Sequence, residues 1–143
     1  MNILVIHGPN LNMLGKRNPE LYGNFTQDEL YEELSNQFPN VDFTFYQSNV
    51  EGELIDVIHH SMNENYNALL INPGALTHTS IALRDAVEML EIPKAEVHLS
   101  NILEREDFRK VDYIKDVVDG LFMGKKIDSY IEAVAFLLTK SVV

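Results

Sequence analysis

Short apolar runs alternate with longer amphipathic segments along this chain, and this alternation constrains the fold more than any other feature of the sequence. The apolar runs are predicted strands at residues 2–7, 41–45, 68–71, 95–99 and 117–123. Apolar residues at helical spacing between and after them predict helices at 26–38, 54–62, 80–90 and 127–138. Thr26 and Glu29 also form the sequence pattern of a capping box, which begins many helices.

Strands separated by single helices build right-handed βαβ units, which form a parallel sheet with helices on both faces. Five strands in 143 residues predict an α/β fold: a flavodoxin-like three-layer sandwich with a five-stranded parallel sheet of order 2-1-3-4-5. We expect a single domain over residues 1–143. Ligands of such sheets bind at the carboxyl ends of the strands, where the strand order reverses, so a site is expected there.

The charge of the chain limits its partners. It has 22 Asp and Glu residues against 11 Lys and Arg residues, a formal net charge of −11. Phosphate binding depends on surplus Lys and Arg, so we expect neither nucleic acid nor an anionic membrane surface as a partner. The apolar runs are too short for a signal peptide or a membrane span, and we expect a cytoplasmic protein. The lack of Cys excludes disulfides and thiolate chemistry.

Polar stretches follow the first, third and fourth predicted strands, at residues 7–23, 72–80 and 96–101. Taken singly, their Gly, Pro and Asn residues can be explained as turn formers. Three such stretches that meet at one edge of a sheet instead predict a binding site. The candidate side chains are Asn10, Asn12, Arg17, Tyr22, Asn72, His78, His98 and Ser100.

Neither a nucleotide-binding loop nor a metal site is indicated. The glycine spacing of residues 8–16 does not fit a P-loop, and no G-x-G-x-x-G follows a strand. His59 and His60 are neighbours on a predicted helix, so their side chains diverge and cannot share an ion. The histidines that can converge at the strand ends lack partners at a familiar ligand spacing; they are His7, His78 and His98. We therefore expect no metal.

Acid–base chemistry fits better. Glu96 and His98 are two residues apart in a strand, so they project from one face, and a carboxylate there fixes the imidazole tautomer and raises the imidazole pKa. Arg17 and Tyr22 share one loop, where a guanidinium stabilises a phenolate. The alternatives are a core histidine, a solvated arginine and a packed surface tyrosine. A phenolate base with an imidazolium acid describes proton abstraction followed by loss of a leaving group. Side chains suited to hold an anionic substrate are Asn72, Ser100 and Arg109.

Residues 8–17, 19–23, 47–56, 72–80 and 96–101 closely resemble, in order, the motifs of type II 3-dehydroquinate dehydratase. The resemblance implies a flavodoxin-like hydro-lyase that uses neither metal nor cofactor. Such an enzyme dehydrates 3-dehydroquinate to 3-dehydroshikimate by anti elimination through an enolate, in the shikimate pathway. Breakdown of quinate is an alternative setting for the same reaction. A flavodoxin-like module that binds an anion without catalysis is an alternative of another class.

Carried over position by position, the resemblance makes Tyr22 the base at C2 and Arg17 the residue that assists it. Asn10 is implied to position a water against the enolate. His98 becomes the acid for the hydroxyl at C1, with Glu96 as its support. The implied substrate-binding residues are Asn72, His78, Asp85, Leu99, Ser100 and Arg109. Asp85 is expected to reach a neighbouring subunit's pocket, since the family usually forms a dodecamer, a tetramer of trimers.

Overall fold

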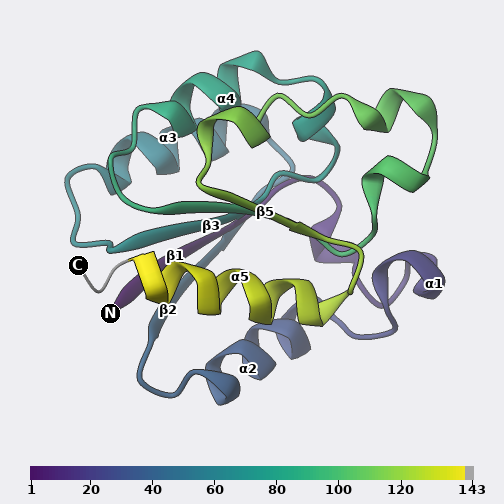
Figure 1. Ribbon diagram of the computed structural model, residues 1–143, viewed down its shortest axis with the longest axis horizontal. Coiled ribbons are helices and arrows are strands. Elements are labelled where there is room, and N and C mark those ends of the chain that lie inside the picture. The colour runs from purple at the N-terminus through teal and green to yellow at the C-terminus, as the bar shows by residue number, and fades with distance from the viewer. Residues whose placement is uncertain (141–143) are drawn as a thin grey trace.

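The computed structural model describes residues 1–140, and the expected domain boundary at residue 143 lies outside them. Its centre is one parallel sheet of five strands in the order β2-β1-β3-β4-β5 (Figure 1). The strands are β1 (Asn2–His7), β2 (Asp42–Gln47), β3 (Ala68–Asn72), β4 (Lys94–His98) and β5 (Gly120–Met123). The predicted α/β fold and its strand order are confirmed.

Helices cover both faces of the sheet. They are α2 (Gln27–Gln37), α3 (Glu51–Ser61), α4 (Ile81–Glu88) and α5 (Ile127–Lys140), while the short helix α1 (Pro19–Tyr22) belongs to the loop after β1. Helices α3 and α4 lie on one face, and α2 and α5 lie on the other (Figure 1). Along β1, Leu4 and Ile6 join the core under α3 and α4, whereas Ile3 and Val5 join the core under α2 and α5. This division follows from the two-residue period of a strand.

The capping box predicted at the start of α2 is present. The Thr26 hydroxyl accepts the backbone N–H of Glu29 at 3.1 Å, and the Glu29 carboxylate accepts the backbone N–H of Thr26 at 3.1 Å. Two donors that the first helical turn leaves free are thereby satisfied. The start of α2 fixes the end of the long loop that follows β1.

Strand β5 is shorter than predicted, because residues 117–119 do not belong to it. Residues Lys115–Val117 form a 3-10 turn instead. The side chain of Asp112 holds this turn, since its Oδ1 accepts the backbone N–H of Ile114 at 2.9 Å and of Lys115 at 3.1 Å. A side-chain hydrogen bond to the backbone competes with strand pairing in this way, and the apolar pattern of the sequence does not reveal it.

Gly8 lies where β1 and β3 end side by side. Its N–H donates to the Asn72 carbonyl at 2.8 Å. A Cβ atom at residue 8 would lie 2.2 Å from the Pro73 carbonyl oxygen, so a residue with a side chain does not fit this approach. The loops that follow the two strands are therefore held together at the point where the strand order reverses.

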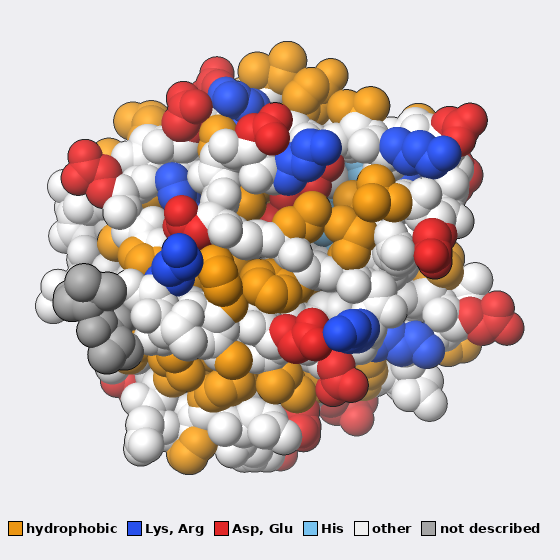
Figure 2. Space-filling model, viewed as in Figure 1, with side chains coloured by type: hydrophobic (Ala, Val, Ile, Leu, Met, Phe, Trp, Pro, Cys, Tyr) orange, Lys and Arg blue, Asp and Glu red, His pale blue; other side chains and the backbone are white. Residues whose placement is uncertain are grey.

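Among residues 1–140, no helix is both long and apolar enough to cross a lipid bilayer. Figure 2 shows one face of the molecule, on which Lys and Arg side chains are scattered among Asp and Glu side chains. Basic and acidic groups are therefore interspersed on this face instead of gathered into separate areas.

Candidate active site

A cleft opens at the carboxyl ends of β1, β3 and β4. Its lining includes most of the predicted site residues, namely Asn10, Arg17, Tyr22, Asn72, His78, His98, Leu99, Ser100 and Arg109. The rest of the lining is Pro9, Leu11, Gly74, Ala75, Ile102 and Arg105. Polar stretches that are far apart in the sequence thus meet at one edge of the sheet, where the topology predicts a site.

Tyr22 is held in the cleft by Arg17. The guanidinium Nη2 donates to the tyrosine Oη at 2.8 Å, and the guanidinium carbon lies 3.8 Å from the centre of the ring. Helix α1, where the sequence predicted only a loop, places the phenol. It begins after Asn18, whose side chain accepts the backbone N–H of Glu20 at 3.0 Å. It ends at Gly23, whose φ of 85° favours glycine.

Glu96 and His98 lie on one face of β4, as predicted, with His98 Nε2 2.5 Å from Glu96 Oε2. Both side chains are buried. The expectation that the pKa of His98 is raised is wrong. Burial lowers that pKa to about 4, because an imidazolium loses its hydration there, and the charge of Asp112 opposes this only in part. Burial therefore favours the neutral imidazole, and an acid at this position needs a source of protons.

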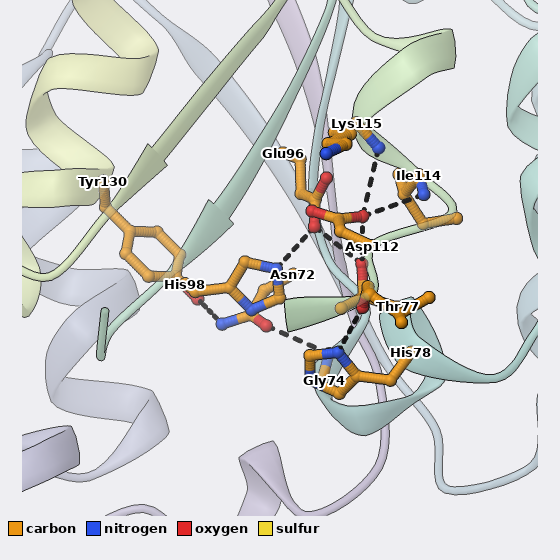
Figure 3. Close-up of polar contacts among 11 residues, drawn as sticks. Asn72, Gly74, Thr77, His78, Glu96, His98, Asp112, Ile114, Lys115 and Tyr130 are labelled. Carbon is orange, nitrogen blue, oxygen red and sulfur yellow. Dashed lines mark hydrogen bonds and ion pairs between the residues drawn. The ribbon is translucent and has the colours of Figure 1, made fainter. Parts of the chain in front are cut away.

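Thr77 and Asp112, which the sequence did not single out, join this pair. Thr77 Oγ1 lies 2.6 Å from Glu96 Oε2 and 2.9 Å from Asp112 Oδ1 (Figure 3). Burial raises the pKa of Glu96 and raises that of Asp112 to about 6. Thr77 belongs to the polar stretch 72–80, which was a usable signal. Asp112 follows no predicted strand, and no sequence spacing relates it to Glu96.

Glu96, His98 and Asp112 form the group of described residues whose ligand-type atoms lie close together, within 4.8 Å of one another. Ligand atoms that lie about 2 Å from a tetrahedral zinc ion are roughly 3 Å apart. The 2.5 Å between His98 Nε2 and Glu96 Oε2 is shorter, and Thr77 occupies the same carboxylate oxygen. This spacing fits hydrogen bonds better than a cation, and the expected absence of a metal stays a prediction.

Asn72 is fixed by a buried network behind the cleft. Its Nδ2 donates to Tyr130 Oη at 2.8 Å, and the Tyr130 hydroxyl donates to His7 Nε2 at 2.9 Å. His7 Nδ1 lies 2.7 Å from Gln27 Oε1, so a neutral ring protonated at Nδ1 satisfies the contacts with Gln27 and Tyr130. Burial lowers the pKa of His7 to about 4, which favours this neutral form. His7 therefore supports Asn72 from behind and is not among the residues that line the cleft.

The segment after β4 adds positive charge to the cleft. Arg105 Nη1 donates to Ser100 Oγ at 3.2 Å, and the Arg105 guanidinium carbon lies 5.3 Å from the centre of the Tyr22 ring. Arg109 Nε donates to Glu106 Oε1 at 3.1 Å. Arg105 stands five residues after Ser100, close to the last strand-end motif.

The other predicted residues fall into two groups. Asn10, whose φ of 73° is left-handed, lines the cleft together with Leu99 and His78. Asp85 is exposed on α4, where it pairs with Arg84 at 3.2 Å, and it does not line the cleft of its own chain. Its expected role concerns a neighbouring subunit and stays a prediction.

Known proteins are similar to this chain over nearly its whole length. The family described as dehydroquinase class II matches residues 1–138. A 3-dehydroquinate dehydratase of Nitrosomonas europaea is 45% identical over 141 residues, which cover 97% of this chain and 98% of that protein. Another, from Clostridium botulinum (strain 657 / Type Ba4), is 46% identical over 143 residues, covering 99% and 97%.

A solved structure agrees with these relatives. The type II dehydroquinase from Butyrivibrio crossotus superposes with a TM-score of 0.93 and 41% sequence identity, over 96% of this chain and 97% of that one. The resemblance of the strand-end motifs thus extends to the overall sequence and to the fold. This chain therefore belongs to the class II dehydroquinase family.

Proposed function

We propose that this cleft dehydrates 3-dehydroquinate with Tyr22 as the base and His98 as the acid. The activity itself follows from the family: the chain has type II 3-dehydroquinate dehydratase activity and is a hydro-lyase. One observation supports the two roles most strongly. A phenol beside a guanidinium and an imidazole beside a buried carboxyl group, two groups suited to opposite proton transfers, line the same cleft.

The proposed reaction is an anti elimination through an enolate. Tyr22, as a phenolate stabilised by Arg17, takes the proton from C2 next to the ketone, and Asn10 holds a water against the enolate oxygen. The enolate electrons then form the C1–C2 double bond, while the C1–O bond breaks with its electron pair. His98 protonates the departing hydroxyl, which leaves as water. Glu96 supports His98 during this transfer through their 2.5 Å contact.

A carboxylate substrate must enter a protein with a net charge of −11. The local field therefore depends on the cations that line the cleft, Arg17, Arg105 and Arg109. We assign substrate binding to these side chains together with Asn72, His78, Leu99 and Ser100. The product is 3-dehydroshikimate, and we place the reaction in the cytoplasm and in the shikimate pathway. Breakdown of quinate is the alternative setting, which the neighbouring genes would distinguish.

The proposed activity has a direct test. Incubation of the protein with 3-dehydroquinate and EDTA should increase the ultraviolet absorbance of the solution, because the product is a conjugated enone and no metal takes part in the proposed chemistry. The control is the same mixture without protein. A module that only binds an anion would hold 3-dehydroquinate without this increase, and a rate abolished by EDTA would contradict the metal-free mechanism.

We infer that the active unit is a closed homo-oligomer, a dodecamer built as a tetramer of trimers. Two facts support a role for Asp85 in a neighbour's site: its side chain is 63% exposed on α4, and it lies outside the cleft of its own chain. Its only partner here is the adjacent Arg84, among the residues described, so it remains accessible to a second subunit.

If subunits share active sites, two variants of low activity should together regain activity in a mixed oligomer. Asp85→Ala and Tyr22→Phe, each weak alone, should regain activity when they are co-expressed, since a mixed oligomer contains sites with an intact Tyr22 and a neighbour's intact Asp85. Light scattering across a dilution series, compared with specific activity, should show activity lost in step with dissociation. A fully active monomer, or mixed oligomers that stay as weak as the separate variants, would overturn the shared site.

A further inference from the structure

The carboxyl group of Asp112 lies behind the acid of the proposed mechanism, and the chemistry above does not use it. Asp112 is 7% exposed and Glu96 is fully buried. The Thr77 hydroxyl links them, at 2.9 Å from Asp112 Oδ1 and 2.6 Å from Glu96 Oε2. In Figure 3 this link continues from Glu96 to the imidazole of His98. Two buried carboxyl groups and the imidazole are thus connected in one row.

The hydrogen atoms in this row can be counted. Thr77 has one hydroxyl proton, but two carboxylate oxygens lie within hydrogen-bond distance of it. Asp112 Oδ1 is already an acceptor for two backbone N–H groups, those of Ile114 and Lys115. If both carboxyl groups were ionised, one contact of Thr77 would join two oxygens with no proton between them. The arrangement therefore fits a pair of carboxyl groups that shares one additional proton.

Two buried oxygen atoms of Glu96 and Asp112 that lack hydrogen-bond partners also indicate one shared proton. Glu96 Oε1 and Asp112 Oδ2 are buried, and neither has a hydrogen-bond partner among the described residues. An unpaired buried oxygen that carries part of a negative charge is costly, whereas one proton held between the two groups lowers that cost. Burial, and then the hydrogen bond and charge of Glu96, accordingly raise the pKa of Asp112.

Other charged groups face this row from several sides. Lys115, on the 3-10 turn before β5, faces Glu96, and its charge lowers the pKa of that carboxyl. Arg105, from the segment after β4, lowers the pKa of His98. His78 and Arg109 approach from the loops after β3 and β4. Burial lowers the pKa of His78, and the charges of His98 and Arg109 lower it further. Asp112 opposes these cations, because its charge raises the pKa of His98.

We propose that Asp112 is a positioning residue for the acid: through Thr77 and Glu96 it keeps a proton available to His98. This inference rests on the proposed function. When His98 gives its proton to the departing hydroxyl, the proton shared by Glu96 and Asp112 moves toward the imidazole. The row then regains one proton from solvent, which has received the proton that Tyr22 took from C2. No oxidant or additional reactant is needed.

The charges of the two carboxyl groups determine in which direction the loss of Asp112 shifts the pH profile. With Asp112 present, removal of the last proton from the row would leave two carboxylates beside a neutral imidazole. Repulsion between the carboxylates opposes that loss, so the row keeps a proton to higher pH. Without Asp112 only one carboxylate is left, and the last proton leaves at lower pH. The alkaline side of the kcat/KM profile reports this loss, since the acid must be protonated in the free enzyme.

The test compares pH profiles of the whole enzyme. Asp112→Asn and Asp112→Ser both remove the charge and keep an oxygen that accepts the Ile114 N–H. We expect each to move the alkaline limb of kcat/KM to lower pH by about one unit, while KM for 3-dehydroquinate stays within about twofold. The titration of His98, followed by NMR in the absence of substrate, should move in the same direction, and it can be read even in a slow variant. Asp116→Asn, at an exposed position on the 3-10 turn Lys115–Val117, is the matched control and should leave the profile unchanged.

The result can separate this inference from the proposed function. An alkaline limb and a His98 titration that stay in place in both variants would overturn the role of Asp112, while the activity of the parent enzyme would stand. A rise in KM with no shift of the limb would also overturn it, because that result describes a merely structural residue. A parent enzyme that fails to dehydrate 3-dehydroquinate would instead defeat the proposed function.

Discussion

Replacement of Tyr22 by phenylalanine is expected to lower kcat by about 10²- to 10⁴-fold, the usual contribution of a positioned base. This corresponds to a barrier higher by about 2.7–5.4 kcal/mol. The substitution removes only the oxygen that Arg17 contacts at 2.8 Å, and it leaves the ring below the guanidinium. KM should therefore change little, because the loss concerns an interaction of the transition state.

Steady-state kinetics from the enone absorbance measure this effect. Tyr66→Phe is the matched control, since Tyr66 packs against the core under α3 and α4 and does not line the cleft. It should keep the parent rate. If Tyr22→Phe retains more than about a tenth of kcat, less than about 1.4 kcal/mol of barrier, Tyr22 is not the base. Arg17→Ala should also be severe, because it removes the cation that stabilises the phenolate.

The place of the site was predictable because it depends on topology. Parallel strands end at one edge of a sheet, so residues 7–23, 72–80 and 96–101 had to meet once the order of the strands was known. The pairing of Glu96 with His98 was equally predictable, because the two-residue period of a strand puts them on one face. Helix α1 was not, since a single turn of helix has too few residues for a periodic pattern.

The burial of His98 and the contacts of Asp112 could not be predicted from the sequence. The carboxylate beside His98 suggested a raised pKa, but the sign is decided by desolvation, which depends on the whole environment of the ring. Asp112 approaches Glu96 only because its loop folds back over η2 (Gly74–His78), where the Tyr113 N–H donates to the Thr77 carbonyl at 2.8 Å. A contact between loops has no periodic pattern in the sequence, so the position of Asp112 beside Glu96 could not be predicted before the fold was known.

Replacement of His98 by asparagine is expected to lower kcat for dehydration by about 10²- to 10⁴-fold, because asparagine cannot supply the proton that the departing hydroxyl takes. Its amide can still donate a hydrogen bond to Glu96, which limits the disturbance of the buried carboxyl. His60→Asn is the control, since His60 is exposed on α3 and lies outside the cleft. Retention of more than about a tenth of the parent kcat would remove His98 from the role of acid.

Isotope exchange then separates the acid from the base. In D2O, the His98→Asn variant should incorporate deuterium at C2 of unreacted 3-dehydroquinate, because Tyr22 still forms the enolate and the phenol exchanges its proton with solvent before the proton returns. Tyr22→Phe should show neither exchange nor product, since no enolate forms. NMR of the recovered substrate measures both outcomes. Exchange in Tyr22→Phe would mean that another group takes the C2 proton. Its absence in His98→Asn would mean that proton removal and loss of the hydroxyl occur in one step, and the enolate would have to be abandoned as an intermediate.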